Sequence, residues 1–357
     1  MEIDYSKLDK IHYSWRSIDG YNKAINIAIS PREPGKTTSY WIEKGVSAWK
    51  RKECIVYCVR YGNEISDYLI TSIFDNINKF MKAPLKPIYK ADFSDGVVDI
   101  YLEENKEKFL AVRIIALNCK LRKLKQMFVQ NLSSMFIDEY IINPETQESY
   151  LKSEAMKIKE LYTTLKRGAP RGLKLYVAGN PYSMFNPLFL DLEVDVSRLK
   201  RGEKYIGENF IIDYATLHPA LREKLLKENP FYKFDEDYSS YALEGIAIND
   251  INIPLSKMPI NYSLRYVFKV SNKYIGIYKN NSDKWNEFNY FCQEEKVISK
   301  HRDVYVIDLA DMITHSTLVT NDLRYYLNRF KDSVAKGNVA FSNINIYYLV
   351  KEIFKKI

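Results

Sequence analysis

The sequence predicts an α/β protein with a mostly parallel sheet, followed by a smaller domain of the same class. Up to residue 212, apolar runs of strand length alternate with segments of helical apolar spacing, which favours parallel strands joined by helices. The chain then becomes charged and polar, and ends in alternating strands and two helices. We therefore expect one domain over residues 1–212, a short linker domain over 213–250 and a second α/β domain over 251–357.

The elements of the first domain follow from local pattern. Strands are expected at the apolar runs and helices where apolar residues recur at helical spacing. Pro84 and Pro87 break the chain after the second helix, and Ser94-Asp95-Gly96 has the composition of a turn. In order, we expect strand 24–29, helix 36–50, strand 54–59, helix 65–81, hairpin 88–102, strand 109–117, strand 132–137, helix 147–167 and strand 173–178.

Composition narrows the class of protein. The 357 residues are 46% hydrophobic and 27% charged, as in ordinary globular proteins. The chain has no apolar run of about 18 residues and no apolar signal core at its start, so we expect a cytoplasmic protein that is neither membrane-bound nor secreted. The net charge of +8 is compatible with a polyanionic partner.

The segment after the first expected strand has the layout of a phosphate-binding P-loop, with an apolar strand, a tight loop and Gly-Lys-Thr opening a helix. Lys36 would reach the β- and γ-phosphates, and the Thr37 hydroxyl would ligate Mg²⁺. The match is imperfect, because Ser30 replaces the first Gly of the pattern and Pro34 removes an amide donor. The expected nucleotide-binding residues are Ser30, Pro31, Arg32, Glu33, Pro34, Gly35, Lys36, Thr37 and Thr38.

Two carboxylates follow the expected strand 132–137. An Asp at the end of a buried strand holds Mg²⁺ in P-loop enzymes, which is the role expected of Asp138. A Glu directly after it can deprotonate the attacking water, so Glu139 is the expected catalytic base. The two motifs together predict hydrolysis of a nucleoside triphosphate with ATP and Mg²⁺ as cofactors. The spacing between them allows an additional strand.

Four blocks, at residues 30–37, 54–61, 136–140 and 179–187, resemble the DNA-packaging (encapsidation) ATPase of small protein-primed tailed phages, a compact relative of the large terminases. The tail at 324–354 is also similar, whereas residues 200–260 match diffusely. The resemblance implies a P-loop ATPase of the additional-strand catalytic-glutamate type. It also implies a pentameric ring on the portal (connector) of a prohead, which pushes double-stranded DNA inward, with a structural prohead RNA as a further partner.

Individual roles are carried over from that resemblance. It implies that Arg32 lies against the γ-phosphate and that Asn180 senses this phosphate and couples hydrolysis to movement. It also places a cation, supplied to the neighbouring subunit, just before the strand at 173–178. Arg167 is our first choice for this cation and Arg171 the second, while Lys123 and Lys125 belong to another basic run that could face a subunit or DNA.

The C-terminal domain is expected to have an RNase H-like fold without nuclease activity. Large terminases carry such a nuclease, which needs several carboxylates around two metal ions. The opening strand expected at 263–271 contains no acid, which leaves Asp308 and Asp311 without a partner on that strand. Further strands are expected at 273–278 and 304–307, and helices at 217–229, 321–336 and 343–356.

Three alternatives to a DNA-translocating motor stay open from the sequence. An active terminase-type nuclease would need the missing acid. A helicase-like nucleic-acid remodeller would need arginine motifs in a second motor domain, and none is visible after residue 250. A nucleotide-binding scaffold without hydrolysis is compatible with Ser30 and Pro34 but leaves Glu139 without a role.

Overall fold

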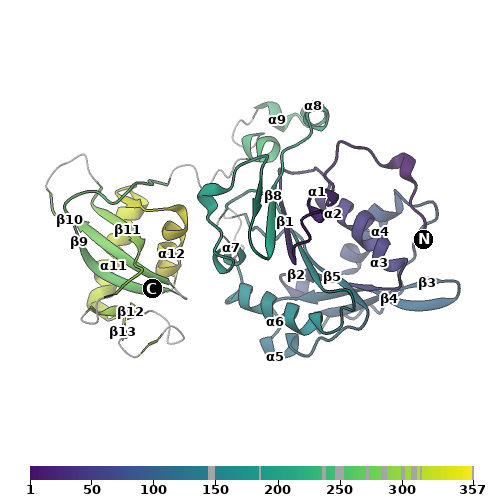
Figure 1. The fold of residues 1–357 in the computed structure, drawn as a ribbon, viewed down its shortest axis with the longest axis horizontal. Coiled ribbons are helices and arrows are strands. Elements are labelled where there is room, and N and C mark those ends of the chain that lie inside the picture. Colours follow the sequence, from purple (N-terminus) through teal and green to yellow (C-terminus); the bar gives the residue numbers. More distant parts are fainter. Residues whose placement is uncertain are drawn as a thin grey trace. The chain divides into compact units, whose positions relative to one another are not determined.

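The computed structural model describes residues 1–143, 149–184, 186–234, 239–245, 253–270, 273–282, 288–298, 302–306, 312–313 and 316–355. The chain divides into two compact units, Met1–Asn249 and Asp250–Ile357, each built on its own sheet (Figure 1). Within the described ranges, no helix combines the length and the apolar character that a membrane span requires.

The first unit contains an eight-stranded sheet in the order β3-β4-β2-β5-β6-β1-β8-β7. Neighbouring strands from β4 to β8 pair in parallel, whereas the edge strands β3 and β7 are antiparallel to β4 and β8. In chain order the strands are β1 (Ile25–Ile29), β2 (Cys54–Val59), β3 (Val97–Glu104), β4 (Glu107–Ala116), β5 (Leu132–Ile137), β6 (Lys174–Gly179), β7 (Lys204–Ile206) and β8 (Phe210–Tyr214).

Strands β2 and β8 are buried at every residue, which indicates that both faces of this sheet are covered. Figure 1 shows α2, α3 and α4 gathered together, with α5 and α6 lying apart from them. The main helices of this unit are α2 (Lys36–Tyr40), α3 (Val46–Trp49), α4 (Asp67–Asn78), α6 (Glu154–Lys166), α7 (Pro187–Asp191) and α8 (Pro219–Glu228). Shorter helical segments are η1 (Tyr5–Lys7), α1 (Arg16–Asp19), η2 (Trp41–Gly45), η3 (Gly62–Glu64), α5 (Leu121–Leu124), η4 (Val196–Arg198), α9 (Phe231–Phe234) and η5 (Ser240–Glu244).

The mixed α/β class with a large parallel sheet is confirmed, and one pairing differs from expectation. The hairpin was expected within 88–102, but β3 pairs instead with β4. Asn105 and Lys106 form the connection, both with positive φ (53° and 63°), as a tight two-residue hairpin turn requires. Ile88 contributes only a single bridge to Tyr101, so the segment before β3 lies along its edge.

Residues 213–234 and 239–245, which fall in the expected linker, are folded within the first unit. Asp213 and Tyr214 belong to β8, which lies beside β1 in the sheet. The helical part that follows has a small apolar core of its own, formed by Leu217, Leu221, Leu225, Tyr232, Ala242 and Leu243. The helix expected at 217–229 is present as α8, whereas its place in the first unit was not expected, because its apolar residues are sparse between charged ones.

The second unit contains a six-stranded sheet in the order β13-β12-β9-β10-β11-β14. Strand β10 pairs antiparallel with β9 and β11, while β12 is parallel to β9 on its other side. This order is compatible with the RNase H-like fold, which stays a prediction. The elements are β9 (Tyr262–Val270), β10 (Lys273–Asn280), β11 (Tyr290–Glu294), β12 (Val304–Val306), β13 (Ser316–Leu318), α11 (Asn321–Ala335), β14 (Val339–Phe341) and α12 (Ile344–Lys355).

Candidate functional site

The loop after β1 has the backbone conformation of a helix N-terminus that faces a ligand. Gly35 precedes the first residue of α2 with φ of +83°, a conformation that L side chains rarely adopt. The Pro34 carbonyl accepts a hydrogen bond from the Tyr13 N–H at 2.8 Å. Trp15 is fully buried and donates its indole N–H to the Lys36 carbonyl at 2.9 Å. The N-terminal segment therefore supports the loop, a long-range contact that the sequence pattern does not reveal.

Lys36 points back into the loop. Its ammonium donates to the Ser30 hydroxyl at 2.8 Å, to Asn180 Oδ1 at 3.0 Å, and to the Ser30 and Pro31 carbonyls at 3.3 Å each. Burial lowers the pKa of Lys36 to about 8, although Asp138 and Glu139 act in the opposite direction. A buried cation whose described hydrogen bonds all go to neutral acceptors favours an anionic ligand.

Asp138 and Thr37 form the second part of the site. The Thr37 hydroxyl donates to Asp138 Oδ2 at 2.6 Å, and Asp138 Oδ1 accepts the Glu139 N–H at 3.0 Å. Burial raises the pKa of Asp138 to about 6, with Glu139 contributing in the same direction. Two adjacent oxygen donors fit Mg²⁺, which takes few protein ligands and keeps waters and phosphate oxygens. Among the described residues, no group of three or more His, Cys, Asp or Glu side chains could hold a metal by itself.

Glu139 is exposed at the tip of a strained turn. Its φ is +48°, in the left-handed region that a non-glycine residue seldom occupies. Such conformations cost about 1–3 kcal/mol and persist where surrounding contacts fix them, often at functional sites. A pocket of about 290 Å³ adjoins the turn and is lined by Thr37, Thr38, Trp41, Tyr57, Cys58, Val59, Glu64, Leu69, Ser72, Ile73, Asn76, Asp138 and Glu139.

Parallel pairing explains why these groups meet. The carboxyl ends of β1, β5 and β6 lie at one edge of the sheet, here called the carboxyl edge. Ser30 follows β1, Asp138 follows β5 and Asn180 follows β6, so all three predicted groups lie at this edge. The structure thus brings together the predicted phosphate, metal, base and sensor residues.

The tip of the P-loop is held by the segment expected as a linker. The Arg32 N–H donates to the Ala242 carbonyl at 3.0 Å, and the Tyr232 hydroxyl donates to Glu33 Oε1 at 2.9 Å. Glu33 has a positive φ of 64°. The Arg32 side chain is half-buried in the same loop. Sequence reasoning missed Tyr232, since nothing local in an isolated Phe-Tyr pair indicates a partner so far along the chain.

The basic residues before β6 lie at the opposite end of the strands. Arg167 caps the C-terminus of α6, and both Arg167 and Arg171 are exposed. Because β6 and β1 are parallel, residues preceding β6 lie at the amino edge of the sheet, away from the P-loop. Gly168 packs tightly here, since a Cβ atom would lie 1.7 Å from the Val129 carbonyl oxygen. This placement leaves both arginines unable to serve the nucleotide site of their own chain.

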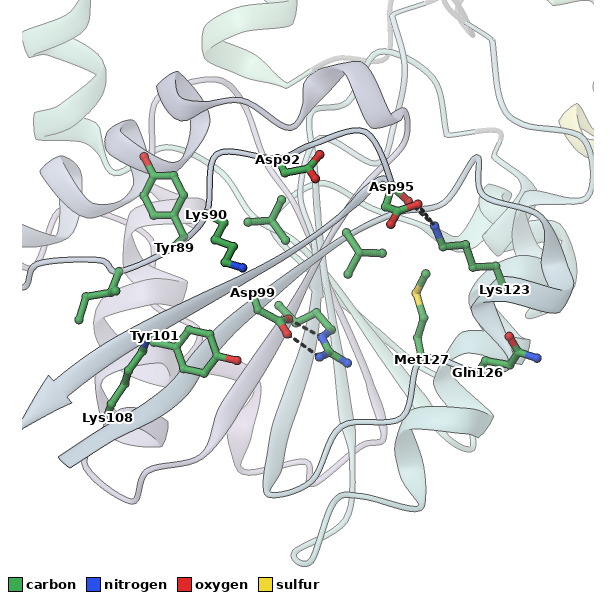
Figure 2. A pocket seen from close by; sticks show the side chains of 14 residues that line it. Tyr89, Lys90, Asp92, Asp95, Asp99, Tyr101, Lys108, Lys123, Gln126 and Met127 are labelled. Atoms are coloured by element: carbon green, nitrogen blue, oxygen red, sulfur yellow. Dashed lines mark hydrogen bonds and ion pairs between the residues drawn. The ribbon is translucent and has the colours of Figure 1, made fainter.

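The other basic run lies beside a different pocket. A hollow of about 820 Å³ is formed around the β3–β4 hairpin, and β2, β5 and β6 separate β4 from β1 in the sheet. Figure 2 shows Lys123 and Asp95 together at one side of this pocket, with Lys123 Nζ 3.1 Å from Asp95 Oδ1. Lys125 pairs instead with Glu160 of α6 at 3.2 Å. Among the described contacts, those of Lys123 and Lys125 are with residues outside the P-loop and the Asp138–Glu139 turn.

The second unit shows no cluster of carboxylates in its described part. Strand β9 carries no acidic residue. Glu294 pairs with Lys273 at 3.0 Å, and Glu295 accepts hydrogen bonds from Tyr278 and Gln293 at 2.7 and 3.1 Å. Asp308 and Asp311, considered from the sequence, lie outside the described residues.

Two solved structures share this fold over nearly the whole chain. A chain of the bacteriophage Phi-29 viral genome packaging motor assembly is 18% identical, with 97% of this chain and 99% of that chain covered and a TM-score of 0.66. A chain of the Phi-28 gp11 DNA packaging motor is 17% identical, with 98% of each chain covered and a TM-score of 0.63. No family model and no curated protein matches the sequence.

The likeness defines the fold as that of viral DNA packaging motor chains. It extends over both units and confirms, at the level of the fold, the resemblance that the motif blocks predicted. At such low identity the likeness does not extend to the roles of single residues, which rest on the geometry of the carboxyl edge.

Proposed function

We propose that this chain is an ATPase that drives double-stranded viral DNA into a preformed prohead. The observation that carries the proposal is the meeting of Lys36, Thr37, Asp138, Glu139 and Asn180 at one sheet edge. This constellation has the parts that phosphoryl transfer to water needs, namely phosphate donors, oxygen ligands for Mg²⁺ and a carboxylate base. It lies in a fold shared with chains of genome packaging motors.

Different groups of the chain bind the phosphates, bind Mg²⁺ and take part in the hydrolysis reaction. Backbone N–H groups at the start of α2 and the Lys36 ammonium bind the phosphates. Thr37 and Asp138 hold Mg²⁺, which neutralises charge on the phosphate oxygens when bound. Glu139 accepts a proton from the attacking water, and Arg32 lies against the γ-phosphate.

Asn180 connects nucleotide state to movement in this scheme. In the structure it accepts a hydrogen bond from Lys36, which also contacts Ser30 and Pro31. Bound phosphates compete for the ammonium and free the Asn180 amide to contact the γ-phosphate. The position of the carboxyl end of β6 then depends on whether the γ-phosphate is present.

A neighbouring subunit completes the site in this proposal. The exposed Arg167, with Arg171 as the second choice, is supplied to the next copy in a ring, which we propose to be a pentamer. A cation delivered in trans stabilises charge in the transition state. The location of both arginines at the amino edge fits this role, because neither can act within its own chain.

The remaining partners follow from charge and from the names of the similar structures. A net charge of +8 favours contact with the DNA backbone or with a structural prohead RNA. Docking on the portal of a prohead in the host cytoplasm is part of the same proposal. No described observation favours the nuclease alternative, since β9 has no acid. The central strands of the second unit are antiparallel, which offers no second motor sheet to a helicase.

The proposal is tested by measuring ATP hydrolysis with and without double-stranded DNA, and again with proheads. Lys36→Ala should abolish DNA-stimulated hydrolysis. Lys50→Ala is the matched control, because Lys50 is an exposed lysine at the end of the same helical stretch. Absence of hydrolysis even with proheads, or equal rates for the two variants, would reject the ATPase.

A further inference from the structure

A buried arginine lies directly behind the turn that carries Glu139. Arg60 follows β2, which is the parallel neighbour of β5, so it reaches the carboxyl edge beside Asp138. Its Nη2 donates to the Tyr140 carbonyl oxygen at 2.6 Å. The same guanidinium forms a two-point ion pair with Glu154, with N–O distances between 3.1 and 3.3 Å.

This ion pair is among the least exposed in the described part of the chain. The side chain of Glu154 is 0% exposed and that of Arg60 is 11% exposed. Glu154 also accepts the Leu151 N–H at 2.7 Å. The guanidinium lies 5.8 Å from the Tyr140 ring centroid and 5.3 Å from that of Tyr150. Burying two charges is costly unless their geometry is well satisfied, and here the contacts join the turn after β5 to the segment before α6.

Tyr140 is fixed at each of its polar groups. Its N–H donates to the Ala178 carbonyl at 3.0 Å, its carbonyl accepts from Arg60, and its hydroxyl accepts the Leu188 N–H at 3.1 Å. Glu139 immediately precedes it, with φ of +48°, and is itself exposed. A left-handed conformation at a glutamate persists only where neighbouring contacts determine it.

We propose that Arg60 is a positioning residue for Glu139 in the hydrolysis reaction. The inference rests on the proposed ATPase function and goes beyond it, because Arg60 would touch neither nucleotide nor water. The arginine holds the Tyr140 carbonyl and, through Glu154, ties the turn to the first residue of α6. Glu139 is thereby presented in one orientation toward the attacking water.

A matched arginine elsewhere in the sheet separates this role from general stability. Arg113 on β4 makes a two-point pair with Asp99, at 2.6 and 2.7 Å, and donates to the Phe128 carbonyl at 3.1 Å. Like Arg60, it combines a two-point ion pair with a hydrogen bond to a backbone carbonyl, but it lies beside no catalytic group. Arg60→Lys and Arg113→Lys each retain the charge and lose the forked geometry.

The first experiment compares steady-state ATP hydrolysis of these two variants. A base that is misplaced by about 1 Å can lose about a hundred-fold in rate, so Arg60→Lys should lower kcat between ten- and a hundred-fold with KM nearly unchanged. For Arg113→Lys, kcat and KM should each stay within about two-fold of the wild-type value. Equal losses in the two variants, or a loss confined to KM, would overturn the proposal.

The second experiment does not depend on hydrolysis. Amide hydrogen exchange should become faster at residues 139–142 in Arg60→Lys and stay unchanged there in Arg113→Lys. The double variant Arg60→Met, Glu154→Met removes both charges, so its melting temperature should exceed that of Arg60→Met alone while kcat stays low. Unchanged exchange, or full recovery of kcat in the double variant, would contradict the proposal. If the unchanged protein hydrolyses no ATP, the proposed function fails, and exchange alone decides on the role of Arg60.

Discussion

The central strands of the two sheets differ in the polar residues that they carry or that follow them. In the first unit, β1, β2, β5 and β6 are followed by Ser30, Arg60, Asp138 and Asn180, all at the carboxyl edge. In the second unit, the central strand β9 has no acid, and Glu294 and Glu295 are already engaged by neighbours on β10 and β11. The candidate chemistry is therefore concentrated in the first unit, where the polar residues that follow adjacent parallel strands lie side by side.

Left-handed backbone conformations occur in both units, and three of them lie at the carboxyl edge of the first sheet. Glu33, Gly35 and Glu139 all have positive φ at the carboxyl edge of the first sheet. The turn at Glu139 is held by a buried ion pair, and the loop tip by contacts from residues beyond β8. At the carboxyl edge these conformations are therefore fixed by contacts from elsewhere in the unit, and the importance of such contacts can be tested by single substitutions.

The largest expected effect tests whether the first sheet needs a second copy. Arg167→Ala should lower ATP turnover by about a thousand- to a hundred-thousand-fold, as loss of an arginine supplied in trans does in other phosphoryl-transfer systems. Mixing Arg167→Ala with Glu139→Gln subunits should restore part of the rate, because each provides what the other lacks. The measurement is turnover against mixing ratio.

Arg171→Ala is the matched control for this mixing experiment, because Arg171 lies in the same segment and is also exposed. If Arg171→Ala gives the loss and the recovery instead, the trans role belongs to Arg171. No recovery at any ratio for either arginine would remove this segment from the active site of the neighbour.

Glu139→Gln should have the next largest effect. Removing a general base costs about a hundred- to ten-thousand-fold in rate, while nucleotide binding should be retained because the P-loop is untouched. Binding is measured with a fluorescent nucleotide and turnover by phosphate release. Glu160→Gln on α6 is the control, since Glu160 pairs only with Lys125 in the described contacts. Unchanged turnover in Glu139→Gln would exclude this residue as the base.

Local motifs predicted much of the first sheet, because its signals are short-range. A buried apolar strand followed by a polar residue marks a carboxyl edge wherever strands are parallel, and Asp138 was found in this way. Ser30 was found through the P-loop pattern, and Asn180 through the family resemblance. The helix at 36–50 was expected as continuous, and the structure has it with a π-helical turn at Trp41–Gly45. The fold class could be predicted for the same reason.

The contacts that stabilise the site could not be predicted from the sequence. The Arg60–Glu154 pair and the Tyr232–Glu33 hydrogen bond each join residues that are distant along the chain. Charged and aromatic residues of this kind are frequent on surfaces, so pattern gives no reason to select them. Pairing of β3 with β4 was missed because Asn105-Lys106 lacks the glycine that usually indicates such a turn.

A smaller effect is expected from Tyr232→Phe, which removes one hydrogen bond to the P-loop tip. Losing such a bond costs about 1 kcal/mol, so KM for ATP should rise about five-fold with little change in kcat. Tyr89→Phe is the matched control, because Tyr89 donates to Asp67 at 2.9 Å away from the carboxyl edge. An equal rise in both variants, or none in Tyr232→Phe, would show that the segment after β8 does not support nucleotide binding.

The smallest expected effect concerns the second sheet, where we predict no cutting of DNA at all. Two-metal nucleases need several carboxylates that are free to bind cations, whereas β9 supplies none and Glu294 and Glu295 are engaged within the sheet. Supercoiled double-stranded DNA incubated with the protein and Mn²⁺ or Mg²⁺ should stay intact by gel electrophoresis. Metal-dependent nicking that persists in Glu139→Gln would place a nuclease outside the carboxyl edge of the first unit. It would also contradict the proposed difference between the two sheets, because both would then carry reactive carboxylates.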